Sequence, residues 1–137
     1  MIPVEKAGPH QRHRLLVVED EVLILIDTAD FLRSRGFEVH EATNADDAIR
    51  VLKSGIPISL VFTDIRMPGS LDGYGLANYI RAHHPHTLLL ATSGHVRIDD
   101  CPPGFPLPIA KPYSLERITN EIEALLASRS TGSANDQ

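Results

Sequence analysis

Carboxylates follow two short apolar segments of the sequence. Glu19 and Asp20 come directly after Leu15–Val18, and Asp64 comes directly after Ile58–Thr63. If both segments are parallel strands, their carboxyl ends meet at one edge of a sheet, where ligands bind in open α/β folds. Carboxylates gathered there repel one another unless a cation joins them, and oxygen ligands with room for water suit Mg²⁺. The pattern therefore predicts a magnesium site that contains a carboxylate nucleophile.

A hydroxyl group and an ammonium group follow two later apolar segments. Thr92 comes after Leu88–Ala91, and Lys111 comes after Leu107–Ala110. The Lys111 ammonium is suited to hold a phosphoryl oxygen, and the Thr92 hydroxyl can donate a hydrogen bond to another. Each residue taken singly has an ordinary explanation as a helix-terminal charge, a turn residue or a strand former. Together, and in this order, they favour phosphoryl transfer.

Short apolar runs alternate with helical patterns, which predicts the elements that position these groups. The expected strands cover residues 15–18, 37–41, 58–63, 88–91 and 107–110, and the expected helices cover 21–35, 44–53, 73–83 and a segment from 114 onward. Gly36 and Gly55 are suited to follow helices, and Asn44 and Ser114 are suited to cap them. The alternation predicts one α/β domain, a flavodoxin-like doubly wound sheet of five parallel strands.

The segment between Thr92 and Lys111 departs from this alternation. It is short and contains the prolines Pro102, Pro103, Pro106 and Pro108. Proline removes a backbone donor and breaks helices. We therefore expect a shortened or irregular fourth helix.

Length and composition bound the class of protein. The 137 residues carry a formal net charge of −5 without a Lys/Arg-rich run, which argues against a nucleic-acid surface. The chain lacks a signal-peptide pattern and a membrane-spanning apolar run, and the single Cys101 suits a reducing compartment, so we expect a cytoplasmic protein. We expect a flexible leader over residues 1–13, one domain over 14–128 without a further output domain, and a flexible tail over 129–137.

The sequence resembles the response-regulator receiver domain of two-component signalling from about Arg14 to Ser128. The motifs that carry the resemblance are VVEDE (Val17–Glu21), FTDIRMPG (Phe62–Gly69), Asp72-Gly73, ATSG (Ala91–Gly94) and KPY (Lys111–Tyr113). The resemblance implies a single-domain response regulator that catalyses only its own phosphorylation and dephosphorylation and is not a metabolic enzyme. It implies a histidine kinase or a histidine phosphotransfer protein as the phosphodonor, and output through protein contacts or a phosphorelay.

The resemblance also implies a role for each candidate residue. Asp64 corresponds to the phosphoacceptor, and Thr92 and Lys111 correspond to the residues that hold the phosphoryl oxygens. The implied Mg²⁺ ligands are Asp64, Asp20, Glu19 acting through water, and the backbone carbonyl of Arg66. The aromatic residue that usually switches in this family lies three residues before the lysine, and here that position is Pro108.

Three other interpretations stay open. A haloacid-dehalogenase-like phosphatase also uses an aspartate nucleophile with Mg²⁺, but it needs a second aspartate where this chain has Arg66. A flavodoxin-like electron carrier needs a Gly- and hydroxyl-rich phosphate loop where this chain has the acidic residues 19–21. A degenerate receiver that acts only as a scaffold is the third interpretation.

The first helix is too apolar for a single buried stripe. The residues expected to face the sheet are Ile24, Thr28, Phe31 and Leu32, and those expected on another side are Val22, Leu25, Ile26 and Ala29. Exposed apolar groups beside a site tend to mark an interaction surface. We therefore expect the second set to pack against a helix of the phosphodonor.

Overall fold

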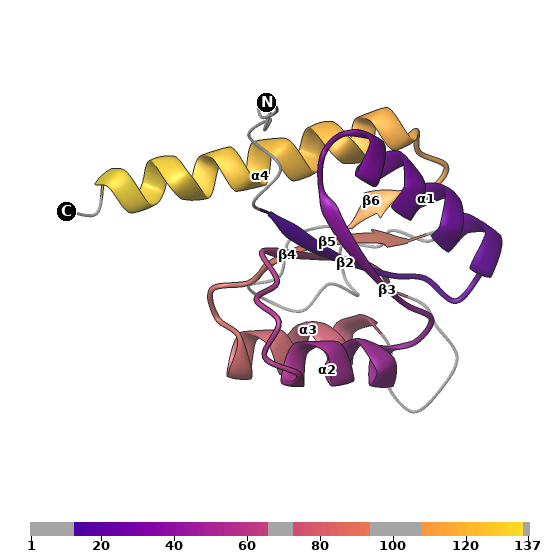
Figure 1. Ribbon diagram of the computed structural model, residues 1–137, viewed down its shortest axis with the longest axis horizontal. Helices are drawn as coiled ribbons and strands as arrows, with labels where there is room; N and C mark the ends of the chain where they lie inside the picture. Colours follow the sequence, from indigo (N-terminus) through magenta and orange to yellow (C-terminus); the bar gives the residue numbers. More distant parts are fainter. Residues whose placement is uncertain (1–12, 66–72, 94–107, 136–137) are drawn as a thin grey trace, which may run out of the picture.

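The computed structural model describes residues 13–65, 73–93 and 108–135 (Figure 1). The strands are β2 (Arg14–Val18), β3 (Glu38–Ala42), β4 (Leu60–Asp64), β5 (Leu88–Ser93) and β6 (Ile109–Ala110). The helices are α1 (Val22–Ser34), α2 (Ala45–Lys53), α3 (Gly73–His83) and α4 (Leu115–Asn135). The predicted alternation of strands and helices is therefore confirmed.

The five strands form one parallel sheet in the order β3-β2-β4-β5-β6. β2 lies beside β4, with Val18 opposite Thr63, and β4 lies beside β5, with Asp64 opposite Thr92. This register brings the carboxyl ends of the three central strands to one edge. The flavodoxin-like α/β fold predicted from the sequence is confirmed.

Helices cover both faces of the sheet, as Figure 1 shows. α1 and α4 lie on one face, and α2 and α3 lie on the other. Each face has its own apolar core. The first contains Leu32, Phe62 and Ile118, and the second contains Leu16, Leu52 and Leu76. The central strands are buried on both sides, which explains why their sequences read as continuous apolar runs.

The predicted helix ends are also confirmed. The Asn44 side chain accepts a hydrogen bond from the Asp47 N–H at 2.7 Å, and the Ser114 hydroxyl accepts one from the Arg117 N–H at 3.0 Å. Gly36 and Gly55, which follow α1 and α2, have φ angles of 99° and 92°. This left-handed conformation costs glycine little, so both helices end where the sequence indicated.

The predicted orientation of α1 is wrong for three residues. Leu25 and Ala29 are buried, whereas Ile24 is 36% exposed. The buried stripe consists of Leu25, Thr28, Ala29 and Leu32. This stripe has the helical spacing of the predicted one but starts one residue later, and Thr28 and Leu32 belong to both. Because residues 22–26 are all apolar, helical spacing alone leaves more than one possible buried stripe. Packing against the sheet and α4 decides between them.

Two predictions concern the ends of the described ranges. The prediction of a shortened or irregular fourth helix falls on residues 94–107, which lie outside the described residues. Pro108 is buried just before β6. α4 continues to Asn135, past residue 128 where we expect the domain to end. None of the helices in the described ranges is both long enough and apolar enough to cross a membrane.

Candidate functional site

Asp64 is the last residue of β4 and is almost completely buried, with 7% of its surface exposed. Its strand is fixed at this point by the neighbouring strand, because the N–H of Ile65 donates a hydrogen bond to the Thr92 carbonyl at 2.9 Å. A buried carboxylate is costly unless it is paired or holds a cation. The position of Asp64 therefore calls for positive charge nearby.

Lys111 supplies that charge from the other side of β5. Its backbone N–H donates to the Ser93 carbonyl at 3.0 Å, which places the residue directly after β6. Its ammonium donates a hydrogen bond to Asp64 Oδ2 at 2.7 Å. Desolvation by burial acts to lower the pKa of Lys111, but the hydrogen bond and charge of Asp64, together with the charge of Glu19, outweigh it and raise the pKa. The Lys111 ammonium therefore stays protonated near neutral pH.

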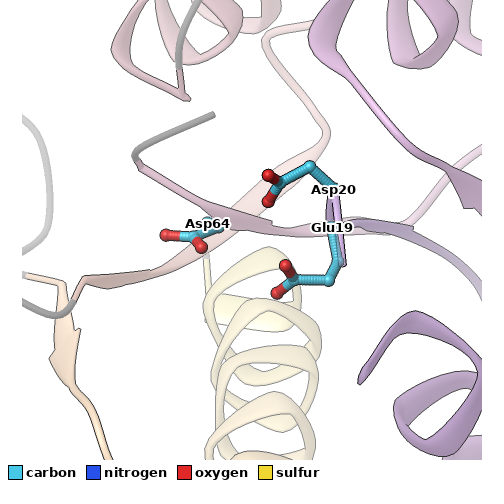
Figure 2. A group of neighbouring side chains, drawn as sticks. All are labelled: Glu19, Asp20 and Asp64. Carbon is cyan, nitrogen blue, oxygen red and sulfur yellow. The ribbon is translucent and has the colours of Figure 1, made fainter. Parts of the chain in front are cut away.

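Glu19 and Asp20 follow β2 and extend toward the end of β4, as Figure 2 shows. The Glu19 N–H donates to the Ala42 carbonyl at 3.0 Å, and the Glu19 carboxylate accepts from the Glu21 N–H at 3.0 Å. Carboxylate oxygens of Glu19, Asp20 and Asp64 all lie within 4.8 Å of one another. The loop after β2 and the end of β4 thus converge on one acidic group.

The electrostatics of Glu19 show that this acidic group lacks sufficient positive charge on its own. Burial, reinforced by the charge of Asp64, raises the pKa of Glu19 to about 7, although the backbone hydrogen bond from Glu21 and the charge of Lys111 act in the opposite direction. A divalent cation bound among the three carboxylates would offset the repulsion between their negative charges. The donor set of hard oxygens fits Mg²⁺. Arg66, whose carbonyl the sequence resemblance adds to the ligands, lies outside the described residues.

Thr92 lies opposite Asp64 in the sheet and is 1% exposed. Burial raises the pKa of Tyr113, while the charge of Lys111 and the nearby Thr92 hydroxyl act to lower it. The sequence motif contained Tyr113 without assigning it a role, and its hydroxyl is what distinguishes it from an ordinary apolar core residue.

Gly73 is a second residue that the sequence analysis did not connect to the site. Its N–H donates to the Ile65 carbonyl at 2.8 Å, so α3 begins directly against the end of β4. A Cβ atom at this position would lie 2.6 Å from the Asp64 carbonyl oxygen and 2.6 Å from the Ile65 Cα. Only glycine allows this approach, and its role depends on tertiary contact rather than on a local pattern.

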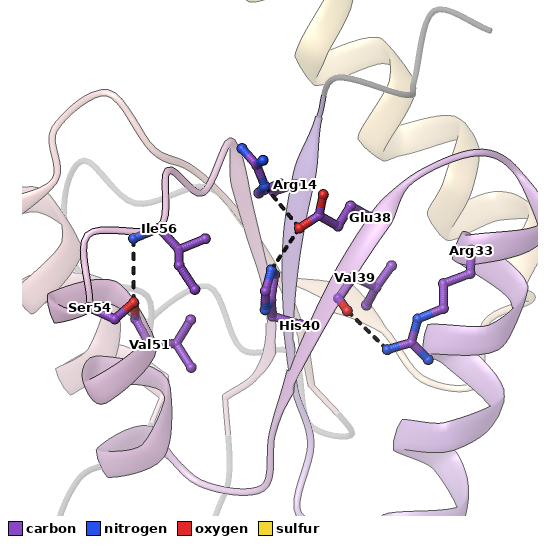
Figure 3. A network of polar contacts seen from close by, with 8 residues as sticks. All are labelled: Arg14, Arg33, Glu38, Val39, His40, Val51, Ser54 and Ile56. Atoms are coloured by element: carbon purple, nitrogen blue, oxygen red, sulfur yellow. Dashed lines mark hydrogen bonds and ion pairs between the residues drawn. The ribbon is translucent and has the colours of Figure 1, made fainter. Parts of the chain in front are cut away.

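A separate polar network lies at the opposite edge of the sheet (Figure 3). Arg14 and His40 both contact the Glu38 carboxylate, at 2.9 and 3.1 Å. The hydrogen bond from Arg14, followed by that from His40, lowers the pKa of the exposed Glu38 carboxyl. These residues connect β2 to the edge strand β3. Because Arg14 and Glu38 begin their strands, the network does not belong to the acidic site.

The structure thus brings together five of the residues predicted from the sequence. They are Glu19, Asp20, Asp64, Thr92 and Lys111. The three carboxylates form an acidic pocket, the lysine is paired with the central carboxylate, and the threonine is its neighbour on the adjacent strand. Such a pocket is typical of a phosphoacceptor site.

Known proteins share both the sequence pattern and the fold. The family model described as the response regulator receiver domain matches residues 15–123. The probable transcriptional regulator ycf27 of Pyropia yezoensis is 32% identical over 120 residues, covering 85% of this chain and 49% of that protein. The sensor kinase CckA of Brucella abortus is 29% identical over 120 residues, covering 82% of this chain and 12% of that protein. The chain therefore spans half or less of the length of these curated relatives.

Solved structures agree with this match. A response regulator receiver protein from Sinorhizobium medicae is 30% identical with a TM-score of 0.78, covering 85% of this chain and 96% of that one. The response regulator TrrA from Thermotoga maritima, solved in complex with Mg²⁺ and BeF, is 26% identical with a TM-score of 0.73, covering 82% and 98%. The family match covers most of the chain and includes the acidic pocket. This chain belongs to the response regulator receiver domains of two-component signalling, which are signalling phosphoacceptors rather than metabolic enzymes.

Proposed function

We propose that Asp64 accepts a phosphoryl group from a phosphohistidine donor in a reaction that requires Mg²⁺. The observation that carries the proposal is the 2.7 Å pair between Lys111 and Asp64 beside two further carboxylates. The Asp64 carboxylate has the Lys111 ammonium on one side and two further carboxylates, able to hold a metal ion, on the other. This arrangement suits the binding of a charged, planar phosphoryl group. The roles assigned below to individual residues belong to this proposal.

The reaction forms one bond and breaks one. An Asp64 carboxylate oxygen bonds to phosphorus as the N–P bond of the phosphohistidine breaks, and the imidazole nitrogen keeps the electron pair of that bond. The Lys111 ammonium and the Thr92 hydroxyl donate to the phosphoryl oxygens. Mg²⁺, held by Asp20 and Asp64, with Glu19 acting through water and the Arg66 carbonyl as a further ligand, would neutralise charge on the transferred group. Positioning and charge neutralisation supply most of the catalysis in such transfers.

The proposed partner is a histidine kinase or a histidine phosphotransfer protein, and the proposed location is the cytoplasm. Four apolar side chains are exposed at the start of α1, next to the acidic site: Val22, Leu23, Ile24 and Ile26. A groove of about 560 Å³ runs beside them between α1 and the start of α4. An apolar patch with a groove suits a helix of the phosphodonor. Leu25 and Ala29, which the sequence pattern also predicts on this surface, are buried instead.

Output through partner contacts or onward transfer of the phosphoryl group is part of the same proposal. A scaffold that never accepts a phosphoryl group is the alternative that an experiment has to exclude. The burial of Asp64 and its pairing with Lys111 support the acceptor function, because a scaffold gains nothing from a costly buried charge cluster.

Labelling with a small acyl phosphate tests the proposal without a cognate kinase. Wild-type protein should incorporate label in the presence of Mg²⁺ and lose most of it when the metal is chelated. Asp64→Asn should abolish incorporation, while Asp30→Asn, which changes an exposed aspartate on α1, should leave it unchanged. Undiminished label on Asp64→Asn, or no label on the wild type, would contradict the proposed function.

A further inference from the structure

Thr63 is a buried polar residue in an otherwise apolar part of the sheet. It directly precedes Asp64 in β4 and is 1% exposed. Its neighbours in the sheet are Val18 on β2 and Ala91 on β5, which are both apolar and buried. A valine of nearly the same shape would suit these surroundings, because a hydroxyl is costly to bury unless it forms a hydrogen bond. The hydroxyl of Thr63 therefore needs an explanation of its own.

The Thr63 hydroxyl donates a hydrogen bond to the backbone carbonyl of Asp64 at 3.0 Å, and this contact is buried. It acts on the peptide group that directly follows the candidate phosphoacceptor. The N–H of the same peptide group belongs to Ile65 and donates to the Thr92 carbonyl at 2.9 Å. The peptide group between residues 64 and 65 is thus held at its oxygen by a side chain and at its nitrogen by β5.

A third hydrogen bond holds the next peptide group along the chain. The N–H of Gly73 donates to the Ile65 carbonyl at 2.8 Å, which fixes this end of β4 against the start of α3. The bonds made by Ile65 and Gly73 join backbone atoms only. Since the donor of the remaining bond is the Thr63 side chain, a substitution can remove that bond and leave the other two in place.

The orientation of the Asp64 carbonyl matters because it defines the ψ angle of Asp64. The rotamers open to a side chain depend on the φ and ψ angles of its backbone. A carbonyl held by Thr63 therefore limits where the Asp64 carboxylate can lie relative to the Lys111 ammonium, 2.7 Å away. Reacting groups have to be held within about 0.5 Å of the productive geometry, and a displacement of about 1 Å can slow a reaction by about 10²-fold.

We propose that Thr63 is a positioning residue for phosphoryl transfer to Asp64 and acts through the Asp64 backbone carbonyl. This inference rests on the proposed phosphorylation of Asp64. The Thr63 hydroxyl carries one proton and donates it to the main chain, so it does not donate to the phosphoryl oxygens. That role is proposed for Thr92 and Lys111. The two threonines on adjacent strands thus have different tasks, one orienting the acceptor and the other contacting the transferred group.

Labelling of the whole chain with acetyl phosphate and Mg²⁺ tests this inference. Thr63→Val keeps the shape of the side chain but removes the donor, so labelling of Asp64 should slow by about fivefold or more. Thr63→Ser keeps the hydroxyl and should label within about twofold of the wild-type rate. If Thr63→Val does not fold, Thr63→Ser and Thr63→Ala give the same comparison, and the serine variant should label about fivefold faster than the alanine variant.

Thr87→Val is the matched control. The Thr87 hydroxyl also donates to a backbone carbonyl at 3.0 Å, that of Ile58. Thr87 precedes β5 and Ile58 precedes β4, so this contact lies at the amino-terminal edge of the sheet, away from the acidic site. Thr87→Val should lower the free energy of unfolding, as Thr63→Val does, yet leave labelling at the wild-type rate.

Three results would overturn the inference and leave the proposed function intact. They are a wild-type labelling rate in Thr63→Val, a Thr63→Ser variant as slow as Thr63→Val, and a Thr87→Val variant that slows as much as Thr63→Val. The last two would attribute the loss to packing or to general stability instead of the Thr63 hydroxyl. A wild-type protein that takes no label on Asp64 would overturn the proposed function, and this inference with it.

Discussion

The Lys111 ammonium lies 2.7 Å from Asp64 Oδ2, and these two residues are 47 positions apart in the chain. The contact crosses β5, which lies between β4 and β6 in the sheet. Because the side chain of Asp64 is only 8% exposed, the ion pair is shielded from water on the carboxylate side. The parallel sheet thus converts two distant sequence motifs into one preorganised charge pair.

Replacing Lys111 by methionine should slow acyl-phosphate labelling of Asp64 by about tenfold or more. Methionine keeps the apolar part of the side chain but removes the charge that faces the incoming phosphoryl group, and a tenfold loss corresponds to about 1.4 kcal/mol. Lys53→Met, at the exposed end of α2, is the control and should label at the wild-type rate. Equal rates for Lys111→Met and the wild type would remove Lys111 from the proposed transfer.

The raised pKa of Glu19 makes stability depend on pH. The ordinary value of 4.5 rises to about 7 in the folded state, chiefly through burial, so the folded protein favours the protonated carboxyl. The contribution is fully present below pH 4.5 and is lost as the pH rises through about 7. The free energy of unfolding, measured by urea denaturation without divalent metal, should therefore fall across this window.

Glu19→Gln separates this effect from other titrating groups. The amide stays neutral, and its oxygen can still accept from the Glu21 N–H. The difference in unfolding free energy between wild type and Glu19→Gln should grow in favour of the variant as the pH rises from 4.5 to above 7. Adding Mg²⁺ at pH 7.5 should stabilise the wild type more than the variant. A constant difference across the pH range would contradict the raised pKa.

Gly73→Ala should damage the site as well as the stability. The added Cβ would meet backbone atoms of residues 64 and 65 at 2.6 Å, so β4 or α3 has to shift. Overpacking of this kind costs about 1–3 kcal/mol. Gly55→Ala is a matched control: it meets no atom within 4 Å but is strained by its φ of 92°, at about 1–2 kcal/mol. Both should lower stability, but only Gly73→Ala should slow labelling of Asp64.

Docking of a protein phosphodonor should depend on Ile24. Ile24→Ser removes apolar surface from the groove, whereas Ile56→Ser removes a side chain of the same 36% exposure far from it. Transfer from a phosphorylated donor protein should slow with Ile24→Ser and stay unchanged with Ile56→Ser. Labelling by the small acyl phosphate should be the same for both. Equal slowing by the small donor would point to a damaged site rather than lost docking.

The sequence predicted the sheet and most of the acidic site because both depend on local patterns. Asp64 and Lys111 each follow an apolar run directly. Because the strands are parallel, the residues at their carboxyl ends lie at the same edge of the sheet. Asn44 and Gly36 are likewise local signals, since a cap and a left-handed residue act within one turn. Such features need no knowledge of distant contacts.

The errors and omissions concern features that arise only from packing. Leu25 and Ile24 are both apolar and adjacent, so helical spacing alone did not decide which of them faces the core. Gly73 matters because α3 packs against the Asp64 carbonyl, a contact that the local sequence does not reveal. Tyr113 likewise packs against Phe62, which is far away in the sequence, and no local pattern predicts that contact. Local patterns locate strand ends but not the contacts made across them.

Chemical trapping of the phosphorylated residue tests the central claim most directly. An acyl phosphate on aspartate is reduced by borohydride to homoserine, which changes the mass of the peptide that contains it. After incubation with a small acyl phosphate and Mg²⁺, borohydride treatment and peptide mass spectrometry should place homoserine at position 64. Homoserine at Asp20 or another carboxylate, or its absence from a wild-type protein that carries label, would contradict the assignment of Asp64 as the phosphoacceptor.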